Sequence, residues 1–549
     1  MPISLPQPNY VTPVRPRRRR PAAASLITAG VLTWTLVTTR TGIAQNRETP
    51  SHYTNPILWD DLADIDILRV GDTYYYSASN MHYSPGAPIL RSYDLTHWEY
   101  IGHSLPVLDF SPKYSLQGGQ AYVKGSWASF LGYRPHEKAF YWGGCIEFRH
   151  TPIYSAPAAE GPWKKKAELD KCYYDAGLLV DDDDTMFVAY GGGTLHVAQL
   201  SPDGTREVKN EAVFTAPKEI GYLEGSRFYK YRGNYYIFTT HPANAEYVLR
   251  STHGPFGPYE VRPLLDRASI PIPGAGVPHQ GGIVQTAAGA WYYMAFIDAF
   301  PGGRVPVMAP LQWTEDGWPT LNLADNTWQL SYPAPLIAAK HPSTPSPRTS
   351  YRFTGPTLEP EWEWNHNPDN SKWSLSHGLI LSTATVTDDL YGARNTLTHR
   401  IPGPMSAATV HLDFSRMKDG DCAGLVMLRD LSAWIGVVKE HGAYRLVRMN
   451  NLTMDKNHDT LSKGTQVASL PLNGSAIWLR VNADIHPGPG RTALFSYSND
   501  GKAYNNFGDP FVMTDDWHFF MGYRFGIFNY ATGSLGGSVS ISSFDISQP

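Results

Sequence analysis

The feature that most constrains this chain is a short motif that recurs through its first two-thirds, a turn followed by a strand rich in aromatic and β-branched residues. Copies of it occur at Val70–Tyr76, Glu137–Trp142, Asp181–Tyr190, Tyr231–Phe238 and Ala288–Phe296. Their spacing of roughly 45–65 residues is the period expected of propeller blades, each a four-stranded sheet packed radially around a channel. No long helical period separates them, which argues against strand–helix–strand units. A generic β-sandwich is the alternative, but the regular recurrence favours an all-β chain that begins with a five-bladed β-propeller.

A Pro- and Ser-rich segment divides the chain. At 549 residues the chain is too long for one compact core. Residues 339–349, which contain the sequence AKHPSTPSPR, have the composition of a linker. Beyond it, strands alternate apolar and polar residues between Gly-containing turns. We therefore predict a propeller over residues 52–338 and a β-sandwich of jelly-roll type over residues 350–549.

The N-terminal residues 1–44 have the pattern of a secretory signal peptide. Five arginines between positions 15 and 20 precede an apolar run from about Ala22 to Val37, and small residues follow. An uncleaved membrane anchor is the alternative, although the run is short for a span. Removing residues 1–44 deletes six arginines and no acids, so the formal charge falls from −4 to −10. We expect a secreted, extracellular protein that binds neither nucleic acid nor, in its mature form, a membrane.

The cysteines suggest no disulfide framework. The chain has three, Cys145, Cys172 and Cys422. A bridge between Cys145 and Cys172 and a pair of buried free thiols are both consistent with the sequence.

Three carboxylates stand beside segments with the pattern of an innermost blade strand. They are Asp64 in ADIDILRV, Asp175 in YYDAGLLVDDDD and Glu224 in YLEGSRFYKY. In a propeller the innermost strands start at the axial funnel, so these acids are expected to face one pocket. Such a group suits glycoside hydrolysis, which requires a carboxylate base, a protonated acid and a means of separating their pKa values.

Other acids in the sequence are rival candidates for these roles or are explained by a structural position without a catalytic role. Asp66 competes with Asp64, because both lie at the start of the same strand. Asp60 and Asp61 are expected at the rim of the funnel. Residues 181–184, four consecutive aspartates, are expected to form a solvated turn or a cation-binding loop.

Several motifs together resemble glycoside hydrolase family 43. They are NPILWDDLADIDILRVGDTYYYSAS, YYDAGLLVDDDDTMFVAYG, EGSRFYKYRGNYYIF, HQGGIV and GGRVPVMAPLQW, and the C-terminal EWEWNHNPDNSKWSL and MGYRFGIFNYAT resemble the β-sandwich fused to such propellers. More narrowly, the chain resembles fungal arabinoxylan arabinofuranohydrolases. The resemblance implies that Asp64 is the general base, Asp175 the pKa modulator and orienter, and Glu224 the general acid of an inverting reaction. It also implies that no cofactor is required.

The resemblance suggests further residues around the sugar. Arg304 resembles an arginine that contacts the sugar, and its planar donors suit paired hydroxyls. His279 resembles a histidine on the propeller axis that lies beside a hydrated, structural calcium ion. Trp127, His82 and Tyr83 are candidates to line the sugar subsite, and each could equally be blade packing. Phe525 or a neighbour could reach the funnel from the sandwich.

The expected activity is therefore release of α-L-arabinofuranose from arabinoxylan, including doubly substituted xylose, by a monomeric enzyme. A β-xylosidase acting on xylo-oligosaccharides would use the same acids with a pyranose pocket. A non-catalytic carbohydrate-binding propeller is the alternative from another class, and it predicts the loss of at least one acid.

Overall fold

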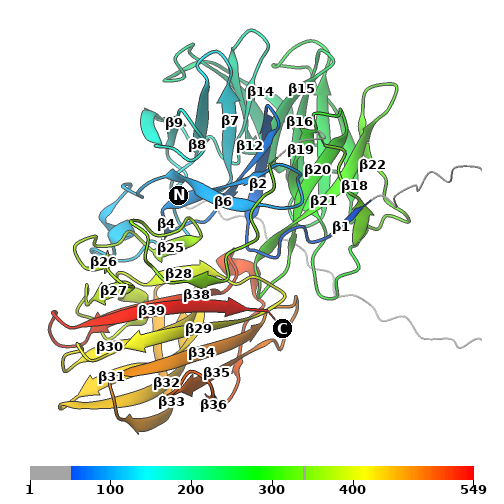
Figure 1. Ribbon diagram of the computed structural model, residues 1–549. Helices are drawn as coiled ribbons and strands as arrows, with labels where there is room; N and C mark the ends of the chain where they lie inside the picture. The colour runs from blue at the N-terminus through cyan, green and yellow to red at the C-terminus, as the bar shows by residue number, and fades with distance from the viewer. Residues whose placement is uncertain (1–50, 338–341, 549) are drawn as a thin grey trace, which may run out of the picture. The chain divides into compact units, whose positions relative to one another are not determined.

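Antiparallel four-stranded sheets build the first part of the computed structural model, which describes residues 51–337 and 342–548 (Figure 1). Within residues 51–337 there are five such sheets, each a simple up-and-down meander. The first strands of successive sheets contact one another in a closed ring around the axis. The predicted five-bladed propeller is confirmed.

The blades follow one another along the chain. Blade I comprises β2 (Ala63–Val70), β3 (Thr73–Ser79), β5 (Gly86–Ser92) and β6 (Glu99–Leu105). Blade II comprises β7 (Ser129–Arg134), β8 (Ala139–Gly144), β9 (Thr151–Ala156) and β10 (Lys164–Leu169). Blade III comprises β11 (Gly177–Val180), β12 (Met186–Gly192), β13 (Thr194–Leu200) and β14 (Glu207–Thr215). Blade IV comprises β15 (Glu224–Tyr231), β16 (Asn234–His241), β17 (Ala245–Ser251) and β18 (Glu260–Asp266). Blade V comprises β19 (His279–Gln285), β20 (Trp291–Asp298), β21 (Arg304–Trp313) and β22 (Pro319–Leu321).

Each of the five sequence motifs forms the hairpin between the first and second strands of a blade. The aromatic residues of the motif belong to the second strand, where they fill the space between neighbouring blades. Tyr76 and Tyr293 are examples, and both are almost completely buried. The repeat therefore marks the blade centres because each blade must bury both faces of that strand.

Two short strands bring the ends of the propeller together. β1 (His52–Thr54) pairs with β23 (Ser331–Pro333). Beside this pair, the Asn55 amide donates to the Met308 carbonyl at 2.9 Å and accepts from the Met308 N–H at 2.8 Å. The N-terminal segment is thus attached to blade V, which closes the ring.

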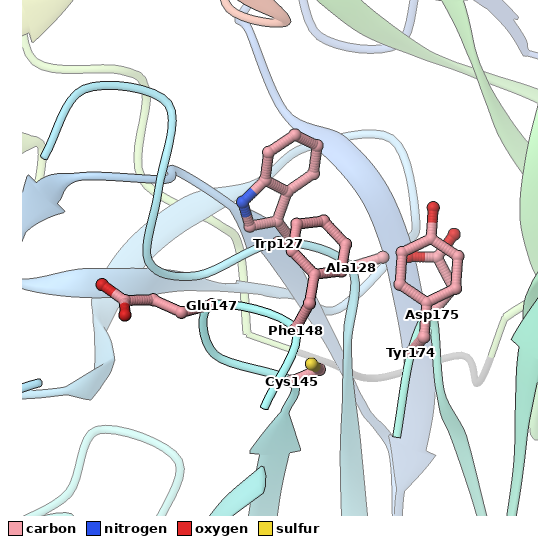
Figure 2. A pocket seen from close by; sticks show the side chains of 7 residues that line it. All are labelled: Trp127, Ala128, Cys145, Glu147, Phe148, Tyr174 and Asp175. Carbon is pink, nitrogen blue, oxygen red and sulfur yellow. The ribbon is translucent and has the colours of Figure 1, made fainter. Parts of the chain in front are cut away.

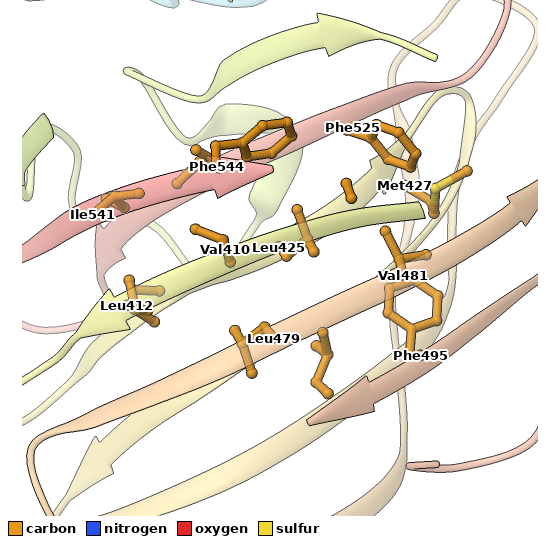
Figure 3. Close-up of a cluster of buried hydrophobic side chains, with 14 of the residues drawn as sticks. Val410, Leu412, Leu425, Met427, Leu479, Val481, Phe495, Phe525, Ile541 and Phe544 are labelled. Carbon is orange, nitrogen blue, oxygen red and sulfur yellow. The ribbon is translucent and has the colours of Figure 1, made fainter. Parts of the chain in front are cut away.

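The second part of the chain is a sandwich of two antiparallel sheets, as predicted. One sheet contains β24 (Ser350–Tyr351), β26 (Trp373–Leu375), β27 (Leu379–Ser382), β29 (Met405–Asp413), β34 (Ala476–Asp484), β35 (Thr492–Ser498), β36 (Asn505–Asn506), β37 (Phe511–Val512) and β39 (Ser538–Ser547). The other contains β25 (Trp362–Asn365), β28 (Leu397–Arg400), β30 (Asp421–Leu428), β31 (Leu431–Glu440), β32 (Ala443–Met454), β33 (Thr460–Leu472) and β38 (Arg524–Ala531). Figure 3 shows their apolar faces meeting, with Val410 and Leu412 from one sheet and Leu425 and Phe525 from the other.

The propeller also contributes a strand to the sandwich. β4 (Tyr83–Ser84) follows β3 and precedes β5 of blade I along the chain, but it pairs with β25 at the edge of the second sheet. Beside this pairing the Glu363 carboxylate is completely buried. It binds Arg400 at 2.9 Å, Arg524 at 2.5 Å and His103 of the propeller at 3.0 Å.

Helices are few and short in the described part of the chain. They are the 3₁₀ helices η1 (Pro112–Ser115), η2 (Leu390–Gly392) and η3 (Trp517–Phe519). Over residues 51–337 and 342–548, no helix has the length and apolar character needed to cross a membrane. The predicted signal peptide at residues 1–44 lies outside the described residues.

Cys145 and Cys172 form a disulfide, and Cys422 is a buried free thiol.

We expect Glu363→Gln to destabilise the protein by about 3–5 kcal/mol, because the substitution leaves two buried guanidinium groups without their carboxylate. The measurement is the free energy of unfolding in urea, followed by tryptophan fluorescence. Asp388→Asn is the control, since Asp388 pairs with Lys463 on the surface and should hardly change the midpoint. Equal effects of the two substitutions would contradict the assignment of Glu363 as a buried charge centre.

Candidate active site

The innermost strands of blades I, IV and V share a β-bulge at their starts. The pairing register shifts by one residue between Ala63 and Asp66 in β2, between Glu224 and Arg227 in β15, and between His279 and Gly282 in β19. A bulge redirects side chains and often lies next to a functional site. The same irregularity in three blades therefore points to the axial end of the propeller.

Two of the three predicted acids lie at these strand starts, and the third precedes the innermost strand of blade III. Asp64 is within the bulge of β2, Glu224 is the first residue of β15, and Asp175 lies just before β11. Asp64 and Asp175 have left-handed backbone conformations, with φ of 59° and 50°. Such conformations are uncommon for residues other than glycine and concentrate at functional sites. Both side chains are about 95% buried, whereas that of Glu224 is partly exposed.

Asp64 and Asp66 have different surroundings. The Asp64 carboxylate accepts a hydrogen bond from the Ser79 hydroxyl at 2.6 Å and lies 3.7 Å from Nη1 of Arg304. Asp66 instead accepts from the backbone N–H of Leu131 in blade II at 2.7 Å. Burial raises the pKa of Asp66 to about 6. Asp66 thus joins two blades, and Asp64 is the carboxylate beside the other candidate residues.

A single guanidinium group fixes the main chain around all three acids. Arg227, which is 1% exposed, donates to the carbonyl oxygens of Asp64 and Ile65 in blade I, both at 2.7 Å. It also donates to Ala176 at 2.8 Å and to Ser226 at 2.9 Å. Each of these carbonyls belongs to a candidate acid or to a residue within two positions of one. We call this set of contacts the Arg227 hub.

The electrostatics of the site raise the pKa values of two of the acids. Burial raises the pKa of Glu224, and the negative charge of Asp64 raises it further. The Tyr174 hydroxyl donates to Glu224 at 2.8 Å and opposes this shift. Burial, Glu224 and Asp64 also raise the pKa of Asp175. Neighbouring carboxyls of this kind resist simultaneous ionisation, so one of them keeps a proton to a higher pH.

Arg304, which the sequence suggests as a sugar-contacting residue, lies beside Asp64. It is the first residue of β21, and its Nε donates to Asp298 at 3.1 Å. Its guanidinium lies over the rings of Phe296 and Phe520, 4.9 and 5.4 Å from their centroids. Its position close to Asp64 places planar, charged donors beside the candidate base.

Aromatic side chains form the wall next to Asp175 (Figure 2). A small pocket there is lined by Trp127, Phe148 and Tyr174 together with Asp175. The Phe148 ring lies between the other two, at 6.1 Å from Trp127 and 5.8 Å from Tyr174. Phe148 is half exposed, so its ring is available to a carbohydrate. Small-molecule sites are typically lined by aromatic and apolar side chains with a few placed polar groups.

Two of the predicted subsite residues lie elsewhere. His82 and Tyr83 have no exposed surface, so they cannot line the pocket. His82 contacts Asn365 of the sandwich at 3.1 Å, and the ring of Tyr83 packs under Arg524. Both were misplaced because the sequence does not show that the sandwich covers this side of blade I.

Phe525 is also not a pocket residue, because it lies in the sandwich core and has no exposed surface. Its neighbour Phe520 takes that place, with its ring 4.9 Å from Trp127. The expectation that the sandwich reaches the funnel through Phe525 or a neighbour therefore applies to Phe520.

His279 does not form a metal site with other protein ligands. It is 2% exposed, its Nδ1 bonds to the Val277 carbonyl at 2.9 Å, and burial lowers its pKa. Calcium takes six to eight oxygen ligands, and the described residues contain no group of three or more His, Cys, Asp or Glu able to hold a metal. The donor set therefore does not fit a calcium ion held by the protein, and the expected structural calcium stays a prediction.

Asp60 and Asp61 were expected at the rim of the funnel but are buried.

The four aspartates at 181–184 form the turn between β11 and β12. Their charge is balanced by protein cations, with Lys230 binding Asp182 at 2.8 Å and Arg134 binding Asp184 at 2.6 Å. This arrangement favours a solvated turn.

Residues missed in the sequence share one property, which is that their partners are distant in the chain. Arg227, Phe148 and Tyr174 are examples. The signal for Arg227 was available, since an arginine stands in the strand EGSRFYKY, of which Gly225–Phe228 are buried, and a buried charge requires a partner.

Neighbouring carboxyls with raised pKa values, an arginine and an aromatic wall at the axial end of a β-propeller are the features of a glycoside hydrolase. The family model described as "Glycosyl hydrolases family 43" matches residues 53–319, and "Beta xylosidase C-terminal Concanavalin A-like domain" matches residues 350–547. The chain belongs to glycoside hydrolase family 43.

Relatives with different activities resemble this chain over most of its length. A solved structure of a GH43 enzyme, engineered to display both endo-xylanase and exo-arabinofuranosidase activity, is 47% identical, with a TM-score of 0.88, and covers 91% of this chain and 100% of its own. A β-xylosidase of Formosa agariphila is 28% identical over 90% of each chain. A non-reducing end α-L-arabinofuranosidase of Bacteroides ovatus is 28% identical over 77% of this chain and 82% of its own.

We expect Arg227→Lys to lower kcat/KM by at least about tenfold, because an ammonium group cannot reproduce the planar set of hydrogen bonds that fixes the acids. The measurement is steady-state hydrolysis of an aryl glycoside. Arg134→Lys is the matched control, since Arg134 is also buried but pairs with Glu137 and Asp184 far along the blade from the acids. Full activity of Arg227→Lys would show that the hub is dispensable.

Proposed function

We propose that this protein is an exo-acting α-L-arabinofuranosidase that removes arabinofuranose side chains from arabinoxylan, including those on doubly substituted xylose. The observation that carries the proposal is the 47% identity, over 91% of this chain, to a GH43 enzyme whose engineered form displays exo-arabinofuranosidase as well as endo-xylanase activity. The side chains around the acids agree with this choice, because the Arg304 guanidinium beside Asp64 and the aromatic wall beside Asp175 are the kinds of group that hold a terminal sugar.

In this proposal Glu224 is the general acid. Its raised pKa keeps it protonated, so that it can transfer a proton to the leaving glycosidic oxygen as that oxygen separates from the anomeric carbon. Asp64 is the general base and takes a proton from the water that attacks the same carbon from the opposite face. The products are arabinose with inverted configuration and the shortened polymer. Inverting enzymes hold their two carboxyls roughly 6.5–9.5 Å apart to admit this water.

Asp175 would orient Glu224 and maintain its protonation. The backbone carbonyl of Asp175 accepts from the Ser226 N–H at 2.9 Å, two residues after Glu224. A negative charge on one of these carboxyls disfavours ionisation of the other. The pair would therefore retain one proton, which Glu224 would pass to the leaving oxygen.

β-Xylosidase activity is the second candidate. It is favoured by the β-xylosidase of Formosa agariphila, which matches 90% of this chain, and by the match of the sandwich to a β-xylosidase C-terminal domain. The two activities need the same three acids and differ in the shape of the sugar that fits beside Arg304. A non-catalytic carbohydrate-binding propeller is disfavoured, because Asp64, Asp175 and Glu224 are all present at the strand starts.

We further propose that the enzyme is secreted and acts as a monomer. The proposal of secretion rests on the pattern of residues 1–44. The disulfide between Cys145 and Cys172 is compatible with an oxidising compartment.

We expect wheat arabinoxylan to yield arabinose when incubated with the protein, and Glu224→Gln to lower the rate by about 10²- to 10⁴-fold, because the amide cannot protonate the leaving oxygen. The sugars are separated by anion-exchange chromatography. Release of xylose alone would replace the first candidate by β-xylosidase. Binding of the polymer without release of either sugar would overturn the enzyme assignment.

We expect Tyr174→Phe to move the alkaline limb of the kcat/KM profile to higher pH by roughly one unit. The Tyr174 hydroxyl stabilises ionised Glu224 and so lowers its pKa. Without it the pKa rises, and the general acid stays protonated to a higher pH. Tyr173→Phe is the control, because the neighbouring Tyr173 hydroxyl donates to Glu207. An unchanged or lower limb in Tyr174→Phe would argue against Glu224 as the acid.

A further inference from the structure

Two neighbouring aspartates before β2 are buried but have different partners. The Asp60 carboxylate accepts a hydrogen bond from the Tyr100 hydroxyl at 2.9 Å, within blade I. Both oxygens of Asp61 accept main-chain N–H groups from other parts of the molecule. Oδ1 accepts from Arg304 in blade V at 2.8 Å, and Oδ2 accepts from Gly522 in the sandwich at 2.9 Å.

Asp61 and its neighbour hold the backbone of Arg304 on both sides. The Leu62 N–H donates to the Arg304 carbonyl at 2.8 Å. The Asp61 carbonyl in turn accepts from Nε of Arg400 in the sandwich, also at 2.8 Å. One short segment of blade I is therefore bonded to blade V and to the sandwich at the same point.

The junction is too tightly packed to admit extra atoms. A Cβ on Gly303 would lie 2.2 Å from Oδ1 of Asp61, and one on Gly522 would lie 2.3 Å from the Gly302 carbonyl oxygen. Nearby, the Tyr523 N–H donates to the Pro301 carbonyl at 3.0 Å. The backbones of the two loops are thus in direct contact. The Asp61 carboxylate accepts the hydrogen bonds of the N–H groups that the loops direct toward it.

Both loops carry side chains that lie beside the candidate base or against the aromatic wall. Arg304 reaches to 3.7 Å from Asp64. Phe520, two residues before Gly522, covers the Arg304 guanidinium and contacts Trp127. A shift of the sandwich loop relative to blade V would therefore move the sugar-facing wall and the arginine beside the candidate base together.

We propose that Asp61 is a positioning residue for the sugar-binding pocket, acting through the main chain of Arg304 and through the sandwich loop that carries Phe520. This proposal rests on the proposed hydrolase function but holds whether the sugar is arabinofuranose or xylose. A carboxylate is required because both of its oxygens accept N–H donors. An asparagine would direct its own NH₂ group at one of them.

The test compares Asp61→Asn with Asp60→Asn in the full-length protein. The substrates are 4-nitrophenyl α-L-arabinofuranoside and 4-nitrophenyl β-D-xyloside, and kinetics are measured on whichever the parent hydrolyses. Asp61→Asn should lower kcat/KM by about 10- to 100-fold, chiefly by raising KM, because the sugar contacts are displaced. Asp60→Asn should stay within about threefold of the parent.

A double-mutant cycle with Phe520→Ala separates positioning from general destabilisation. If Asp61 acts through Phe520, the loss in the double variant should be clearly smaller than the product of the single losses. Losses that multiply, equal losses in the two asparagine variants, or an unchanged KM in Asp61→Asn would each overturn the proposal.

Gly522→Ala tests the same junction if Asp61→Asn does not fold. Its added methyl group would push the sandwich loop from blade V while leaving the carboxylate in place. The same rise in KM is expected, and an unchanged KM would contradict the proposal. A parent inactive on both substrates would count against the proposed function instead. Asp61 would then be tested by calorimetric binding of xylo-oligosaccharides, with the same ordering of variants expected.

Discussion

The Arg227 guanidinium is the interaction on which the arrangement of the acids depends. It is buried at the propeller axis, and its direct hydrogen-bond partners are backbone carbonyls of blades I, III and IV. The nearest carboxylate oxygen, that of Asp66, is 3.8 Å away. A buried charge of this kind is tolerated when several dipoles and a nearby opposite charge compensate it. The cation thereby links three separate sheets into one frame at the axis.

This frame explains why the acids could be identified from the sequence. The aromatic hairpin marks each blade in the sequence, and the strand before that hairpin must start at the axis. An acid at such a start, as in Asp64 and Glu224, is unusual enough to be noticed without knowledge of its partners. Local pattern and global topology point to the same positions.

The walls of the pocket could not be predicted in the same way. His82 looked like a subsite residue because only its neighbours in the chain were known, and the sandwich that buries it lies about 280 residues later. Phe520 and Asp61 belong to a junction of three chain segments. No periodicity records such a junction, because each segment separately looks like an ordinary loop. Contacts of this type depend on how finished sheets pack, and a single sequence does not reveal that packing.

The strand that blade I lends to the sandwich has a consequence for the history of such proteins. Because β4 completes a sheet whose other members come from the second half of the chain, neither half is a self-contained module. An exchange of sandwiches between related genes would break a sheet edge and expose the charges around Glu363 unless blade I changed with it. Natural recombination should therefore have transmitted the two halves together, and designers of chimaeras should place their crossover points outside this pair.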